Sequence, residues 1–229
     1  GFSGDWYSFD REHLKRVYDF VGDTVTQPTV SFDEFTALYR EETVDAWSTG
    51  RANLQAPHLG RVLLAALEAA GVPTDNIDLD LLLDEYQWGP VEGTTLFPEV
   101  IDGLEMLRDQ GLQLGLITNA FQPMRLRDKE LQHFGILDYF PDVRISAADA
   151  GYLKPHPSIF EMALEQTGTR PQETIYIGDN PVADIRGAHL AGMKGILRVN
   201  RPEPPIASEL IVPDASINSL FDLMPAIDT

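Results

Sequence analysis

Short apolar runs of strand length alternate with helical stretches over the second half of this chain. The apolar runs cover residues 112–117, 143–145, 174–177 and 195–199. Helical stretches fill the intervals between them, over residues 128–134, 157–167 and 181–191. Near-continuous apolar strands are typical of a parallel sheet with helices on both faces. The pattern therefore predicts an α/β core, in which ligands bind at the carboxyl ends of the strands.

The residues before this series show helical periodicity and no convincing strand. Asp10 is suited to cap a first helix, and Ser31 opens a capping-box pattern before a second helix. Two more helices are expected over residues 60–70 and 79–86. The asymmetry predicts a small all-helical domain over residues 1–92 and the α/β core over residues 93–229.

Charge and cysteine content exclude several classes of protein. The chain has 229 residues, a formal net charge of −19 and no cysteine. The negative charge and the absence of a Lys/Arg run argue against nucleic-acid binding. No apolar run is long enough to cross a bilayer, and without cysteine there is no disulfide framework and no thiolate nucleophile. We therefore expect a cytoplasmic protein without a membrane role.

Two groups of polar residues follow the predicted strands. Thr118 and Asn119 end the strand over residues 112–117, where a hydroxyl and a carboxamide can hold a phosphoryl oxygen. Lys154 lies in a segment restricted by Pro155 and Pro157, and a lysine fixed in this way can neutralise an anion. Taken singly, Thr-Asn is more often a helix cap, and such a lysine is more often a surface residue in a rigid turn.

The strongest local signal is a pair of carboxylates after the strand over residues 174–177. Gly178 and Asp179 follow the strand directly, and Asp184 comes as the next helix begins. Two carboxylates at one strand end suit Mg²⁺, which takes one or two of them together with water and substrate phosphate. The alternative is an Asp-Asn turn followed by an acidic first helical turn, which is common in α/β proteins.

In order and spacing, these groups resemble motifs of the haloacid dehalogenase-like hydrolase superfamily. Its second, third and fourth motifs are a strand ending in Ser or Thr, a lysine, and Gly-Asp followed by a further Asp. Thr118, Lys154 and the pair Asp179 and Asp184 match them. The helical domain resembles the cap that one subclass inserts between its first and second motifs. The resemblance implies a Rossmann-like three-layer core with a parallel sheet plus a small all-helical cap domain.

The resemblance also implies a phosphatase mechanism. Thr118 would bind the phosphoryl group with help from Asn119, and Lys154 would offset negative charge. Asp179 would bind Mg²⁺, while Asp184 would support the metal's waters or Lys154. The substrate would be a small phosphorylated metabolite, hydrolysed through an aspartyl-phosphate intermediate.

The first motif, a strand ending in Asp-x-Asp with the nucleophile, has no match in the 229 residues. We expect an upstream segment to supply it, because loss of this strand would leave its neighbours unpaired. The alternatives are a haloacid dehalogenase, which needs no metal aspartate, and a non-catalytic binding protein. Aromatic residues of the helical domain are expected in its core rather than in a pocket, and the sequence leaves the substrate and the oligomeric state open.

Overall fold

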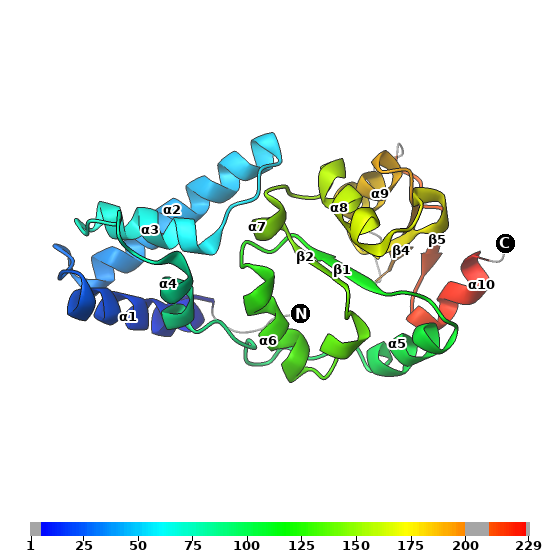
Figure 1. Ribbon diagram of the computed structural model, residues 1–229, viewed down its shortest axis with the longest axis horizontal. Helices are drawn as coiled ribbons and strands as arrows, with labels where there is room; N and C mark the ends of the chain where they lie inside the picture. The colour runs from blue at the N-terminus through cyan, green and yellow to red at the C-terminus, as the bar shows by residue number, and fades with distance from the viewer. Residues whose placement is uncertain (1–5, 200–210, 228–229) are drawn as a thin grey trace.

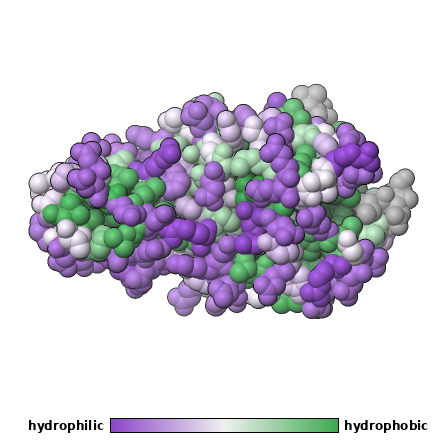
Figure 2. Space-filling model, viewed as in Figure 1, coloured by the Kyte–Doolittle hydropathy of each residue, from purple (hydrophilic) through white to green (hydrophobic). Residues whose placement is uncertain are grey.

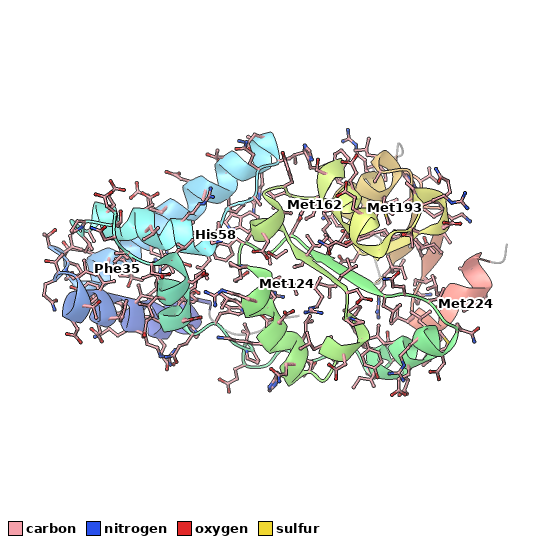
Figure 3. All side chains as sticks on the ribbon, viewed as in Figure 1. Phe35, His58, Met124, Met162, Met193 and Met224 are labelled. Atoms are coloured by element: carbon pink, nitrogen blue, oxygen red, sulfur yellow. The ribbon has the colours of Figure 1, made fainter. Side chains whose placement is uncertain are left out.

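The computed structural model describes residues 6–199 and 211–227, with a helical part at one end and an α/β part at the other (Figure 1). The helical part contains α1 (Trp6–Thr24), α2 (Phe32–Asn53), α3 (Leu59–Ala69) and α4 (Leu79–Tyr86). These helices enclose one apolar core that includes Phe35 and Leu63, and Figure 3 shows Phe35 inside it. This core also takes in Leu126 from the α/β part. The domain boundary after residue 92 therefore stays a prediction.

The first helix begins earlier than the sequence pattern indicates. α1 starts at Trp6, so Asp10 lies in its second turn and the prediction that Asp10 caps the helix is wrong. The Asp10 carboxylate accepts a hydrogen bond from the Tyr86 hydroxyl at 2.8 Å, a partner 76 positions away that no local pattern reveals. The capping box of the second helix is confirmed, because Ser31 and Glu34 bond to each other's backbone N–H groups.

The α/β part is built from short strands and helices in alternation. Its strands are β1 (Gly115–Thr118), β2 (Val143–Ser146), β3 (Ile175–Gly178), β4 (Lys194–Arg198) and β5 (Ala215–Ile217). Its main helices are α5 (Val100–Asp109), α6 (Met124–His133), α7 (Ala147–Ala150), α8 (Pro157–Thr167), α9 (Gly187–Leu190) and α10 (Leu223–Ile227). The helix predicted over residues 181–191 is a π-helical turn (Pro181–Arg186) followed by α9.

The strands are parallel, as the sequence predicts, but among the described residues they form two sheets instead of one. β1 pairs with β2, while β3, β4 and β5 form a separate three-stranded sheet. The edges of β1 and β3 border a pocket of about 440 Å³. Leu164 of α8 lines the pocket, and so do Leu107 of α5 and Leu223 of α10. The pocket therefore lies between the two strand edges and is lined by helices as well as strands.

The helical part is joined to the α/β part at two places. After α2, the backbone of residues 54–56 bonds to the loop before α8, with Ala56 N donating to Gly151 O at 3.0 Å and Leu153 N donating to Leu54 O at 2.9 Å. After α4, the Trp88 indole N–H donates to Glu130 of α6. Figure 3 shows His58, which caps α3, on the side of the helical part that faces α6 and α7.

Polar residues cover much of the face drawn in Figure 2, with apolar residues exposed between them. This distribution agrees with the high negative charge of the chain. None of the helices in the described ranges is long and apolar enough to cross a membrane.

Candidate active site at the ends of β1 and β3

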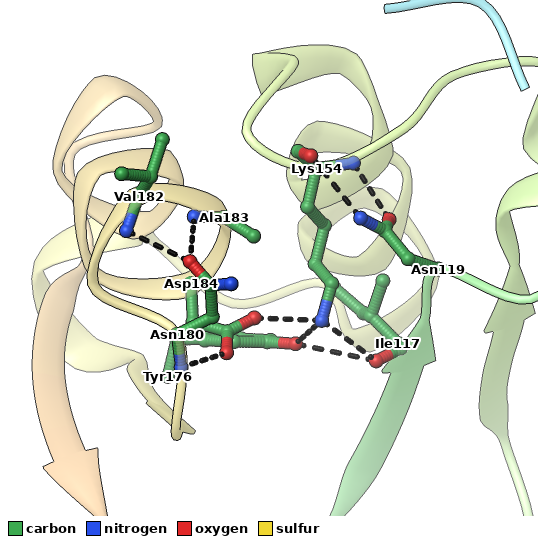
Figure 4. Close-up of polar contacts among 8 residues, drawn as sticks. All are labelled: Ile117, Asn119, Lys154, Tyr176, Asn180, Val182, Ala183 and Asp184. Atoms are coloured by element: carbon green, nitrogen blue, oxygen red, sulfur yellow. Dashed lines mark hydrogen bonds and ion pairs between the residues drawn. The ribbon is translucent and has the colours of Figure 1, made fainter. Parts of the chain in front are cut away.

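The site is organised around Lys154, which lies in the loop between α7 and α8 (Figure 4). The Asn119 side chain hydrogen-bonds to both the backbone N–H and the backbone carbonyl of Lys154. Asn119 Oδ1 accepts from Lys154 N at 2.7 Å, and Asn119 Nδ2 donates to Lys154 O at 3.1 Å. Asn119 follows directly after β1, so this two-way contact fixes the lysine loop to the end of that strand. The Lys154–Pro155 peptide bond is cis.

The Lys154 ammonium points back toward the strands and forms a buried ion pair. Its Nζ lies 2.7 Å from Asp184 Oδ1, and the two side chains are 11% and 5% exposed. Nζ also donates to the Tyr176 hydroxyl at 2.8 Å and to the Ile117 carbonyl at 3.4 Å. A buried charge is costly unless it is paired and hydrogen-bonded, and this ammonium satisfies both conditions.

Asp184 is held in place by the π-helical turn that follows β3. Its Oδ2 accepts from the backbone N–H of Asn180 at 2.9 Å, while Oδ1 faces Lys154. Gly178 is required beside it, because a Cβ at that position would lie 2.3 Å from Asp184 Cγ. Asn180 caps the turn by accepting from the N–H groups of Val182 and Ala183. π-Helical turns are rare and occur frequently at functional sites.

The surroundings of Lys154 and Tyr176 favour the charged lysine and the neutral phenol. Burial by itself would lower the pKa of Lys154, but contact with Tyr176 and Asp184 outweighs it and raises this pKa above its ordinary value. Burial raises the pKa of Tyr176 despite the nearby ammonium. At neutral pH, therefore, Tyr176 is a neutral acceptor for Lys154 and not a counter-ion.

The other predicted site residues lie at the strand ends. Thr118 is the last residue of β1 and pairs in register with Ser146 of β2. Asp179 follows β3 directly and is exposed. The structure thus brings Asn119, Lys154 and Asp184 into direct contact. Their catalytic roles and those of Thr118 and Asp179 stay predictions.

The donor chemistry of the site suits Mg²⁺ in part. Within residues 6–199 and 211–227, no group of three or more His, Asp or Glu side chains is arranged to hold a metal ion. Mg²⁺ needs only one or two protein carboxylates, since water and substrate phosphate complete its shell. Asp179, which is exposed and directly follows β3, is the predicted ligand of this kind. Both oxygens of Asp184 already have partners, so Asp184 suits a role in holding Lys154 better than direct metal binding.

Sequence reasoning missed Tyr176. Its hydroxyl contacts Lys154 Nζ and also donates to the Ile117 carbonyl at 3.2 Å. The only signal in the sequence is a phenol inside an otherwise apolar strand, two positions before Gly178. Because buried tyrosines usually find a hydrogen-bond partner, that position could have marked Tyr176 as a residue that contacts the site.

Comparison with known proteins identifies the family. The profile of the haloacid dehalogenase-like hydrolases matches residues 41–197, which include every predicted site residue. This chain belongs to the haloacid dehalogenase-like hydrolase family. Its relatives include phosphoserine phosphatase of Thermus thermophilus, 35% identical over 189 residues that make up 81% of this chain and 68% of the relative.

Other members of the family are similar to this chain over shorter regions or in fold. Phosphoglycolate phosphatase of Escherichia coli is 36% identical over 148 residues, which cover 64% of this chain and 57% of that protein. A 2-haloacid dehalogenase from Pseudomonas syringae superposes with a TM-score of 0.65 at 25% identity, covering 99% of this chain and 93% of the dehalogenase. A phosphatase of the family from Thermococcus onnurineus superposes with a TM-score of 0.57 at 21% identity, covering 96% of this chain and 88% of that one, and shows the shared fold.

Proposed function

We propose that this protein is a Mg²⁺-dependent phosphatase that hydrolyses small phosphate monoesters. The observation that carries the proposal is the buried Lys154 ammonium, held 2.7 Å from Asp184 beside the strand ends that bear Thr118 and Asp179. A fixed cation in a low-dielectric site stabilises the charge that develops on a transferring phosphoryl group. The relatives named phosphoserine and phosphoglycolate phosphatase support a small phosphorylated metabolite as the substrate.

Each side chain has a distinct task in this proposal. The Thr118 hydroxyl binds a phosphoryl oxygen at the end of β1. Lys154 offsets the negative charge of the phosphoryl group, and Asp184 holds the ammonium in position. Asn119 contributes by fixing the Lys154 backbone, since both polar atoms of its carboxamide are used there.

The proposal includes Mg²⁺ because a single protein carboxylate, with water and substrate phosphate, is enough to hold this ion. Asp179 would hold the ion, and the bound ion would supply further neutralisation of the phosphoryl oxygens. A family hydrolase from Bacillus subtilis, similar in fold with a TM-score of 0.53, was crystallised with magnesium bound. That neighbour supports the choice of metal for this family.

The nucleophile is assigned to an additional strand between β1 and β3. Among the described residues, β1 pairs only with β2 and β3 only with β4, and a pocket lined by Gly115, Ile117 and Ile177 separates the two edges. Neither edge is paired with another described strand, which favours one more parallel strand between them. A carboxylate at the end of that strand would lie near Lys154. The three-layer core with one continuous sheet would then be complete.

The proposed reaction follows from this arrangement. A carboxylate oxygen of the additional strand attacks phosphorus, the ester P–O bond breaks, and the leaving alkoxide takes a proton from water to give the alcohol. Water then hydrolyses the acyl phosphate, which releases inorganic phosphate and restores the carboxylate. Lys154 and Thr118 bind the phosphoryl oxygens in both steps.

A dehalogenase is the second candidate function, because the 2-haloacid dehalogenase from Pseudomonas syringae shares the fold over nearly the whole chain. Halide is a good leaving group that needs no metal to neutralise a phosphoryl charge. Asp179 at the end of β3 favours the phosphatase, since it adds a carboxylate suited to a metal. Halide release from a 2-haloacid without Mg²⁺ would reverse this choice.

The test is phosphate release from p-nitrophenyl phosphate, phosphoserine and phosphoglycolate, with the protein at its natural full length. We expect activity that disappears with EDTA, returns with Mg²⁺ and is lost in Asp179→Asn. Asp75→Asn, an exposed carboxylate between α3 and α4, is the matched control and should retain full activity. No Mg²⁺-dependent release from any ester would overturn the proposal. Equal activity of the 229-residue chain alone would overturn the additional strand.

A further inference from the structure

The Lys154 ammonium has three hydrogen-bond acceptors of unequal quality. Asp184 Oδ1 at 2.7 Å and the Tyr176 hydroxyl at 2.8 Å are within the normal range for such contacts. The Ile117 carbonyl, at 3.4 Å, is at the outer limit. An ammonium has three N–H donors, so two are well bound and the third is bound weakly.

Tyr176 is itself held from two sides. Its ring packs edge-on against Phe160 of α8, with the ring centroids 4.9 Å apart, and Phe160 is fully buried. Its hydroxyl donates to the Ile117 carbonyl at 3.2 Å. Because the single phenolic proton is used there, the oxygen meets Lys154 with a lone pair. The phenol is therefore an acceptor with a fixed position.

We propose that Tyr176 is a positioning residue for catalysis. With Asp184, it fixes two N–H groups of Lys154, so that the third N–H, whose contact with the Ile117 carbonyl is long, keeps one direction and is the donor left for the substrate phosphoryl group. This inference rests on the proposed phosphatase function and adds a residue that no motif of the site contains.

A phenol suits this task better than a second carboxylate would. Two carboxylates on one ammonium would give a net negative cluster, which would repel a phosphate. A neutral acceptor orients Lys154 as firmly and leaves its positive charge available to the substrate. Two fixed acceptors also hold the remaining N–H in one direction, and catalysis depends on such orientation.

The experiment compares wild type with Tyr176→Phe, using the full-length protein, Mg²⁺ and p-nitrophenyl phosphate. Phe keeps the contact with Phe160 and removes only the hydroxyl. We expect kcat to fall by about tenfold, the typical effect of losing one orienting hydrogen bond, and KM to change by less than about twofold. Tyr152→Phe is the control, because Tyr152 is 37% exposed and stacks on His156 outside this network.

A double-mutant cycle tests whether the hydroxyl acts through Lys154. In a Lys154→Met background, Tyr176→Phe should cause no further fall in kcat, since the residue to be positioned is gone. Unchanged kcat in Tyr176→Phe overturns the inference, and so does an equal fall in both backgrounds. Tyr176→Phe alone decides the matter if Lys154→Met does not fold. Absence of Mg²⁺-dependent activity in the wild type would instead contradict the phosphatase function, before any variant is assayed.

Discussion

The helical part and the α/β part of this molecule differ in how completely they bury their cores. The helical part has a single apolar cluster in which Leu59, Leu63 and Leu67 are fully buried. The apolar residues of the α/β part fall into three smaller clusters, and β3 is bordered by a pocket on the side away from β4. The helical part thus encloses one core to which Leu126 of α6 contributes, whereas in the part that holds the predicted site the edges of β1 and β3 border a pocket.

Truncation of one apolar side chain in each of the two parts should give the largest difference in the free energy of unfolding. Leu63→Ala removes a fully buried side chain from the helical core and should lower the free energy of unfolding by about 3 kcal/mol. Ile177→Ala removes a side chain that already borders the pocket between β1 and β3, and about 1 kcal/mol is expected there. Urea unfolding measures both. Equal losses would show that the edge of β3 is as well packed as the helical core.

Substitution of one glycine in each part should separate activity from stability. Gly178→Ala places a Cβ 2.3 Å from Asp184 Cγ, so this carboxylate must leave its present position against Lys154. A displacement of about 1 Å at a catalytic group costs about a hundredfold, so we expect that fall in kcat for the full-length enzyme.

Gly71→Ala, between α3 and α4, is the comparison in the helical part. Gly71 has φ +80° and lies against Thr29, so the added methyl strains the backbone. It should lower stability by about 1–2 kcal/mol and leave kcat unchanged. A fall in kcat as large as that of Gly178→Ala would show that the two parts are coupled in catalysis.

The fold could be predicted from the sequence where local patterns decide it. Apolar runs of strand length correctly predicted parallel strands, and the capping-box pattern at Ser31 correctly predicted the start of α2. The start of α1 was predicted wrongly because the Asp10 carboxylate bonds to Tyr86, a tertiary contact that no local pattern contains. The described strands form two sheets and not one continuous sheet, because β1 and β3 do not pair with each other. The proposed additional strand would join them.

The structure brings together some of the predicted site residues and shows contacts that the motifs do not contain. Lys154 and Asp184 were chosen by motif, and the structure joins them across 30 positions of sequence. Two of these contacts were not predicted. Asn119 uses its whole carboxamide on the Lys154 backbone, and Tyr176 supplies a second acceptor for the ammonium. Both depend on how a loop folds back on a strand end, which spacing along the chain does not specify.

A substitution at the junction between the two parts should have a smaller effect on stability. Trp88→Phe keeps a ring in the helical core but removes the N–H that donates to Glu130 of α6. Hydrogen bonds to charged groups contribute about 1.5–3 kcal/mol, and Arg127 still pairs with Glu130 at 2.7 Å, so a loss of about 1.5 kcal/mol is expected. Trp47→Phe, at the contact with Phe121, is the control for loss of ring area alone. Equal losses of stability in the two variants would show that the hydrogen bond to Glu130 adds nothing beyond the loss of ring area.

The smallest effect is expected from Asp10, a partly buried carboxylate in the helical part. Burial raises its pKa above 3.8, although Tyr86, His13 and Arg40 act in the opposite direction. Because the folded state holds the proton more tightly, the contribution of this group to stability is present below pH 3.8 and is lost as pH rises through the raised pKa. At pH 7, therefore, the charged Asp10 lowers stability relative to a neutral side chain.

Asp10→Asn tests this sign, because Asn is neutral and its Oδ1 still accepts from the Tyr86 hydroxyl. The variant should be more stable than wild type by about 0.5 kcal/mol at pH 7, and the difference should shrink toward zero near pH 3.5, as urea unfolding at the two pH values would measure. Asp19→Asn should instead be less stable than wild type at pH 7, since Asp19 is exposed and pairs with Lys15 at 2.5 Å.

A loss of stability in Asp10→Asn at pH 7 would mean that attraction to His13 and Arg40 outweighs burial. The helical part would then accommodate a partly buried charge as the α/β part accommodates the Lys154 ammonium.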